Sequence, residues 1–180
     1  MSPYWTDYAY DTLGNRTSEV RHGLNGTATS SRTYRYGETG SGPSGSASGP
    51  HTVSSVTQAT AATSTTPQVT SRDTYTYDAS GNTATRVLDG DTQSLTWDKQ
   101  GELTQVTNAD SSVTTYKYDA SGSRIIRDTP TEKTFYLPGT ELHYDKSTAK
   151  VTATRYYTFA GATVAMREAD GVHFLASDHQ

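Results

Sequence analysis

Four aspartates that follow an aromatic residue and precede a glycine by three positions are the residues best placed to do chemistry. They are Asp11, Asp78, Asp98 and Asp119. A carboxylate can bind a metal ion or transfer a proton. A catalytic residue is needed once in a site, however, whereas a residue that recurs in every copy of a motif serves the motif. We therefore interpret these aspartates as turn caps, whose carboxylates accept hydrogen bonds from backbone N–H groups.

Three other patterns could carry chemistry, and each has a stronger structural explanation. Residues 40–45 fit Gly-x-Gly-x-x-Gly, but a dinucleotide site needs a preceding strand and a following helix, and here Pro43 interrupts Gly/Ser-rich sequence. Asp89 and Asp91 lack a third spaced ligand for calcium. Residues 177–179 (Ser-Asp-His) hold the residue types of a hydrolase triad, but neighbours in a strand point to opposite faces. We predict no catalytic residue and no metal site.

Composition excludes several classes of protein. The chain has 180 residues, 13 of them tyrosine, with no cysteine and a formal net charge of −4. It therefore has no thiol chemistry and no basic surface for nucleic acid. No run of 18 apolar residues could span a membrane, and the five histidines show no zinc-binding spacing. Tyr and Thr suit solvated sheets, and helical periodicity is missing. We expect an all-β fold without cofactor, nucleic acid partner or membrane span.

The elements that position the aspartates are β-hairpins. The pattern Tyr-x-Tyr-Asp-x-x-Gly occurs three times, and a fourth copy carries Leu95 and Trp97 in the aromatic positions. The last three copies are 20 and 21 residues apart, a period typical of stacked supersecondary units. A degenerate copy has Gly37 in place of the aspartate. The motif residues are Tyr8, Tyr10, Asp11, Gly14, Tyr34, Tyr36, Gly40, Tyr75, Tyr77, Asp78, Gly81, Trp97, Asp98, Gly101, Tyr116, Tyr118, Asp119 and Gly122.

Each copy has a physical rationale. Two aromatic residues at i and i+2 share one face of a strand, the aspartate ends that strand, and the glycine supplies a left-handed backbone conformation. A second strand follows, such as residues 103–107. A single hairpin is marginally stable in water, so successive hairpins must stack side by side. We expect the Tyr and Trp rings to form an aromatic ladder along one face of the resulting sheet.

The stretch between Tyr36 and Tyr77 is twice as long as a regular repeat. It either hides a whole extra repeat or keeps one repeat and lengthens both its turns. We favour the second interpretation, because residues 53–59 align with residues 103–109. This places loop insertions at about 41–50 and 60–70, which are rich in Gly, Ser, Ala and Thr and are expected to be mobile surface loops.

The repeat resembles the YD repeat of the bacterial Rhs proteins, which is also present in insecticidal Tc toxin complexes and animal teneurins. Residues 135–139, 155–161 and 173–179 resemble the stretch near the end of an Rhs core. The likeness is weakest at 38–70. It implies a single array over residues 1–180, with core-like strands at about 132–180, in which antiparallel hairpins form a spiralling sheet that is part of a shell.

The resemblance also implies a function. In the family such sheets close into a cocoon around a C-terminal toxin effector, so we expect a C-terminal core fragment of a secreted or cell-surface bacterial protein. Its partners would be the rest of its own polypeptide and the enclosed effector, with self-association through sheet edges. No Asp-Pro dipeptide of the family's autoproteolytic element occurs here, and we carry over no catalytic residue.

Two alternatives stay open. The first is a carbohydrate-binding or adhesive module that uses the Tyr/Trp face, since aromatic rings stack on sugars. The second is an enzyme of unfamiliar type near Asp178 and His179, which would need a deep pocket with a perturbed titratable group. Exposed, unpaired rings would favour the first alternative, whereas rings packed against neighbouring strands would favour a shell.

Overall fold

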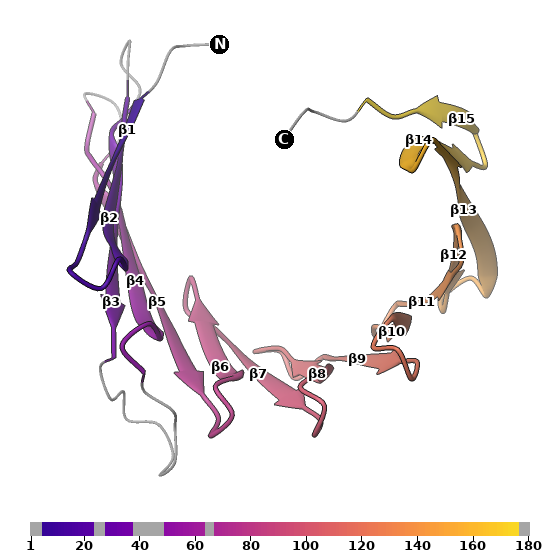
Figure 1. The fold of residues 1–180 in the computed structure, drawn as a ribbon, viewed down its shortest axis with the longest axis horizontal. Coiled ribbons are helices and arrows are strands. Elements are labelled where there is room, and N and C mark those ends of the chain that lie inside the picture. Colours follow the sequence, from indigo (N-terminus) through magenta and orange to yellow (C-terminus); the bar gives the residue numbers. More distant parts are fainter. Residues whose placement is uncertain (1–4, 24–27, 38–48, 64–66, 177–180) are drawn as a thin grey trace. The chain divides into compact units, whose positions relative to one another are not determined.

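The computed structural model describes residues 5–23, 28–37, 49–63 and 67–176. These residues form β-strands and no helix, which confirms the all-β prediction (Figure 1). The order of the strands in the sheet follows the sequence from the first to the fifteenth, and the pairing is antiparallel. The strands are β1 (Trp5–Tyr10), β2 (Arg16–His22), β3 (Ser30–Tyr36), β4 (Val53–Thr60), β5 (Val69–Tyr77), β6 (Thr83–Leu88), β7 (Asp91–Trp97), β8 (Leu103–Thr107), β9 (Val113–Tyr118), β10 (Arg124–Asp128), β11 (Glu132–Leu137), β12 (Thr140–Asp145), β13 (Lys150–Phe159), β14 (Ala162–Glu168) and β15 (Gly171–Phe174).

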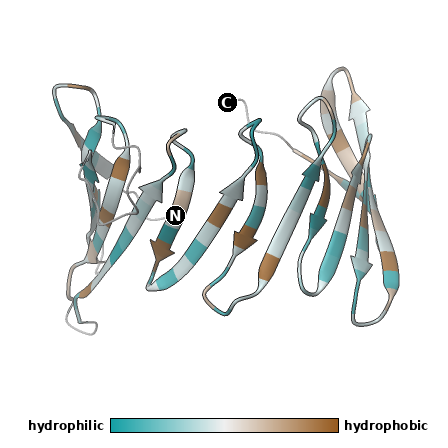
Figure 2. Cartoon of the chain, turned by 90° about the horizontal axis from the view of Figure 1, so that it is seen from below, coloured by the Kyte–Doolittle hydropathy of each residue, from teal (hydrophilic) through white to brown (hydrophobic). Residues whose placement is uncertain are grey.

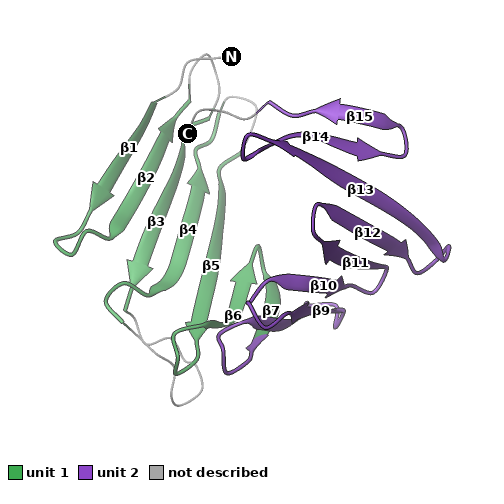
Figure 3. Cartoon of the chain, turned by 45° about the vertical axis from the view of Figure 1, so that its right-hand side comes forward, with its two compact units in different colours: residues 1–95 green, residues 96–180 purple. Residues whose placement is uncertain are grey.

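The chain divides into two compact units (Figure 3). Unit 1 covers residues 1–95 and contains β1 to β6 and most of β7. Unit 2 covers residues 96–180 and contains β8 to β15. Within each unit, every hairpin pairs with the next through backbone hydrogen bonds, as in the register of Val20 with Ser31 in unit 1 and of Arg127 with Thr134 in unit 2. The antiparallel hairpin array predicted from the repeat is confirmed.

Polar side chains make up most of the small buried part of the sheet. Among the described residues the buried hydrophobic side chains are those of Val106 and Ala165. Hydrophilic and hydrophobic residues are interspersed along the strands (Figure 2). The buried polar residues are Asn15, Glu19, Ser55, Thr134 and Thr154. The sheet is therefore held by backbone pairing and side-chain hydrogen bonds, since a thick apolar core is missing from the described part of the chain.

The two predicted insertions have different outcomes. Residues 41–48 of the first one lie outside the described residues, as does Gly40. In the second, Thr60 pairs with Val69 and Ala59 pairs with Thr70, so the prediction of a loop over 60–70 is wrong at its ends. The connection between β4 and β5 is residues 61–68. Thr and Val are β-branched residues that favour strands, and this preference outweighs the low-complexity composition.

Candidate functional site: aspartate turns and the tyrosine face

The motif aspartates cap the hairpin turns as predicted. At Asp78, Oδ1 accepts the backbone N–H groups of Ser80 and Asn82, both at 2.9 Å. The backbone N–H of Asp78 in turn donates to the carbonyl of Asn82 at 2.8 Å. The same contacts, at 2.8–3.0 Å, surround Asp11, Asp98 and Asp119. Each carboxylate therefore accepts hydrogen bonds from its own turn, and its role is structural.

The glycine three residues later closes the turn. Gly81, Gly101 and Gly122 have φ of +85°, +81° and +80°, which confirms the left-handed conformation expected of them. Each donates its N–H to the carbonyl of the motif aspartate at 3.1–3.2 Å. In the degenerate copy Gly37 has φ +64° and donates to the carbonyl of Thr52 at 3.0 Å. In this copy a glycine therefore stands at the position of the capping aspartate.

At Asp11 and Asp78 the turn favours the ionised form of the carboxylate. The side-chain hydrogen bond from Asn15 lowers the pKa of Asp11 below its ordinary value. Burial raises the pKa of Asp78, but the backbone and side-chain hydrogen bonds from Asn82 outweigh it, and the net pKa is lowered. A carboxylate that stays ionised and hydrogen-bonded is a poor proton donor at neutral pH.

The second tyrosine of the motif ties neighbouring strands together, which the sequence analysis did not foresee. The Tyr36 hydroxyl donates to the carbonyl of Arg16 at 3.0 Å, and the Tyr77 hydroxyl donates to the carbonyl of Val53 at 2.8 Å. In unit 2 the Tyr118 hydroxyl donates to the carbonyl of Leu103 at 3.0 Å. Each acceptor is the first residue of the preceding strand, β2, β4 or β8. Burial raises the pKa of all three tyrosines.

In three copies of the motif, those of Tyr8, Tyr34 and Tyr116, the ring of the first tyrosine contacts an arginine. In unit 1 the Arg16 guanidinium lies 4.7 Å from the ring centroid of Tyr34 and 5.6 Å from that of Tyr8. In unit 2 the Arg124 guanidinium lies 4.5 Å from the ring of Tyr136, with the ring of Tyr116 at 5.7 Å on its other side. We call each group a Tyr-Arg-Tyr bridge, and we call the sheet face that carries it in each unit the tyrosine face.

The aromatic ladder predicted from the sequence is wrong at these positions. Strands that carry the tyrosines of the motif alternate with strands that carry none of them, so two motif strands are about 9–10 Å apart, at twice the strand spacing. Rings interact at centroid distances of about 4.5–7 Å. A side chain from the strand between them must therefore fill the gap, and in both Tyr-Arg-Tyr bridges that side chain is an arginine on the middle strand.

A buried carboxylate lies beside the bridge of unit 1. Glu19 is 4% exposed and accepts from Arg21 Nε at 2.7 Å and from the Tyr34 hydroxyl at 3.2 Å. Burial raises its pKa, but the hydrogen bond and charge of Arg21, together with Tyr34 and Arg16, hold the pKa below its ordinary value. The adjoining cavity measures about 100 Å³, below the range typical of ligand pockets. Glu19 therefore neutralises the arginines of the face.

For two of the patterns singled out in the sequence, the structural interpretation stays a prediction. The triad-like residues 177–179 and the Gly-x-Gly-x-x-Gly segment at 40–45 lie outside the described residues. Tyr8 and Tyr10 are 50% and 61% exposed on β1. The part of the chain that the structure describes contains no helix long and apolar enough to cross a membrane.

The fold and the turns define a YD-type β-hairpin repeat protein. The chain belongs to the teneurin YD-shell family, whose model matches residues 2–180. A comparison with curated proteins finds no match. The family assignment agrees with the resemblance in the sequence, and its structural role is that of a shell.

Solved structures show the same fold. A crystal structure of TcdB2-TccC3-Cdc42 aligns with 96% of this chain at 18% identity and a TM-score of 0.55. TcdB2-TccC3 without its hypervariable C-terminal region aligns with 91% at 17% identity and a TM-score of 0.54. A Photorhabdus luminescens Tc holotoxin pore with mutated TccC3 aligns with 92% at 15% identity and a TM-score of 0.51. The chain spans 10% of the length of each.

Proposed function

We propose that this chain is one segment of a shell that encloses a toxin effector. The observation that carries the proposal is the sheet in which every strand pairs with its neighbours in sequence order, since such an array extends by adding hairpins. Membership of the YD-shell family supports the role of this chain as part of a shell wall. The likeness to TcdB2-TccC3 structures supports an effector enclosed by that wall. The wall would act by exclusion, because paired strands offer proteases and targets no free edge.

The finer assignments belong to the same proposal. The motif residues of the turns act as the structural unit of one array over residues 1–180, and no enzymatic step is assigned to them. The partners are the remainder of the parent polypeptide and the enclosed effector, in a secreted or cell-surface bacterial protein. The half-buried rings of Tyr34 and Tyr136 favour this role over carbohydrate binding, since guanidinium groups occupy their faces.

Protease protection tests the proposal. In the full-length polypeptide that contains this chain, limited digestion should leave residues 5–176 and the C-terminal effector intact, because both lie in or behind a paired sheet. Denaturing the polypeptide mildly before digestion should expose the effector. Rapid loss of the effector region from the native polypeptide, with this segment still intact, would contradict enclosure.

Two further measurements address the alternatives. Light scattering of the isolated chain at micromolar concentration should show association, because β1 and β15 each leave one strand edge unpaired within this sheet. A glycan array probed with the same chain should give no specific binding. A stable monomer that binds a defined sugar would favour the carbohydrate-binding alternative through Tyr8 and Tyr10.

A further inference from the structure

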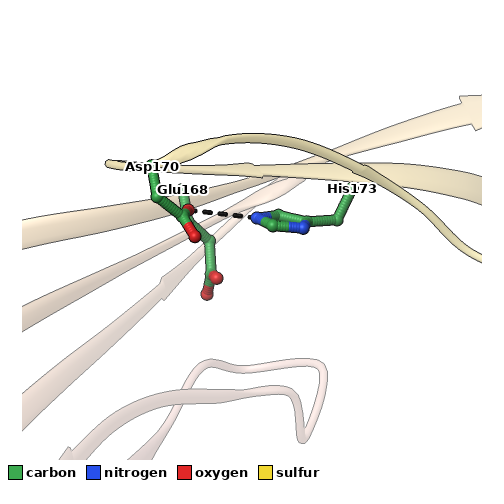
Figure 4. A group of neighbouring side chains, drawn as sticks. All are labelled: Glu168, Asp170 and His173. Carbon is green, nitrogen blue, oxygen red and sulfur yellow. Dashed lines mark hydrogen bonds and ion pairs between the residues drawn. The ribbon is translucent and has the colours of Figure 1, made fainter.

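Three metal-ligating side chains meet at the last hairpin of unit 2. Glu168 ends β14, Asp170 lies in the turn, and His173 lies on β15 (Figure 4). Each offers one ligand atom, and these atoms lie within 4.8 Å of one another. Asp170 Oδ1 and His173 Nε2 are already 3.0 Å apart. The group mixes an imidazole with two carboxylates, which is a donor set found in transition-metal sites.

The strand register sets this arrangement. Glu168 pairs with Gly171 and Met166 pairs with His173, so Glu168 and His173 lie on the same sheet face as diagonal neighbours. Gly171 has φ +146° and carries no side chain opposite Glu168, and a Cβ built there would meet no atom within 4 Å. Gly171 therefore places no side chain between the carboxylate and the imidazole.

A neighbouring strand orients one of the carboxylates. The buried Thr154 hydroxyl donates to Oε1 of Glu168 at 3.3 Å, which leaves the other oxygen for a ligand. An adjoining hollow of about 320 Å³ is lined by Glu168, Asp170 and His143 among others. This hollow leaves room for the water molecules that would complete the coordination of an ion held by three protein ligands.

We propose that Glu168, Asp170 and His173 bind a transition-metal dication of the zinc type. Zinc bonds of about 2.0–2.2 Å place ligand atoms about 3.3 Å apart. The side chains of Asp170 and His173 are 71% and 43% exposed, so their rotation on the surface would bring the ligand atoms together from 4.8 Å. The imidazole favours zinc over calcium or magnesium, which prefer oxygen ligands alone. The ion would fasten β15 to β14 across the turn.

Calorimetric titration of the chain with Zn²⁺ tests the site. The hydrogen bond that His173 donates to Asp170 raises the pKa of His173, so the titration is run at about pH 8, where protons compete less with the metal. We expect one Zn²⁺ per chain at this site and a higher melting temperature when zinc is present. His173→Gln and Glu168→Gln should each weaken binding about tenfold or more and abolish the thermal shift. Ca²⁺ should produce neither effect.

Two control variants locate the ion. His22 forms a similar pair with Asp7 at 2.7 Å on the β1–β2 hairpin but belongs to no three-ligand group among the described residues, so His22→Gln should leave zinc binding unchanged. His143→Gln should also retain binding. Circular dichroism confirms that each variant is folded. The proposal is overturned if zinc does not bind, if His173→Gln binds it as tightly as the unmodified chain, or if His143→Gln is the variant that loses it.

Discussion

The four hairpins that carry a motif aspartate share one turn but differ in the residue two positions after the motif glycine. That position is Arg16 in the β1–β2 hairpin and Arg124 in the β9–β10 hairpin, and both arginines form Tyr-Arg-Tyr bridges. In the β5–β6 hairpin the same position is Thr83. The aspartate turn is nevertheless built alike at Asp78 and Asp119. The turn is thus the constant part of the repeat, whereas the tyrosine face varies from copy to copy.

The largest effect should come from the constant part. Replacing Gly101 by Val should lower the free energy of unfolding by about 1–3 kcal/mol, because a β-branched residue resists φ of +81°. A Cβ at this position meets no atom within 4 Å, so the loss would come from the backbone alone. Lys99→Val, an exposed change in the same turn, is the matched control. An equal loss in both variants by urea denaturation would show that the left-handed conformation of Gly101 is not the determinant.

Acid should weaken the turns next. Hydrogen bonds from Asn15 and Ser121 hold the pKa of Asp11 and Asp119 below the ordinary value of 3.8. Since the folded pKa is the lower one, this stabilisation is present above the unfolded pKa and is lost as pH falls through the folded pKa. Stability should therefore drop below about pH 4.

An Asp→Asn exchange at both positions separates charge from geometry. The amide oxygen still accepts the backbone N–H groups but does not titrate, so the double variant should lose less stability between pH 7 and pH 3 than the unmodified chain. Denaturant midpoints at the two pH values measure the difference. The same acid dependence in both proteins would mean that other carboxylates control it.

A smaller effect is expected from the tyrosine hydroxyls. Tyr77→Phe removes the hydrogen bond to the Val53 carbonyl and should cost about 0.5–1.5 kcal/mol. Tyr10 is 61% exposed, and Tyr10→Phe serves as the control with little expected change. Thermal melts of the two variants measure the difference. Equal melting temperatures would show that the hydrogen bond between Tyr77 and Val53 does not stabilise the pairing of β4 with β5.

The smallest effect concerns the variable part. Arg124→Lys keeps the charge but loses the planar group between the rings of Tyr116 and Tyr136, and should cost about 0.5–1 kcal/mol. Arg155 is exposed on β13, so Arg155→Lys should be neutral. If Arg124→Lys lowered the free energy of unfolding as much as Gly101→Val, the turn would not contribute more to stability than the tyrosine face.

The sequence predicted the features that depend on local backbone chemistry. Asp78 and Gly81 belong to one turn, so their roles follow from residue type alone. Contacts that depend on the pairing of strands were missed, such as Tyr77 with Val53 and Arg124 with Tyr136. An arginine two residues after the glycine was the signal available for the Tyr-Arg-Tyr bridges. The cluster of Glu168, Asp170 and His173 was missed because a diagonal register brings it together.

Electron cryomicroscopy of the full-length polypeptide tests the central claim most directly. We expect residues 5–176 to form part of a continuous β-sheet wall, with density for the effector on its inner side and with β1 and β15 paired to further strands. A reconstruction in which this segment stands apart as a separate module, with both edges free and no cargo behind it, would contradict the account.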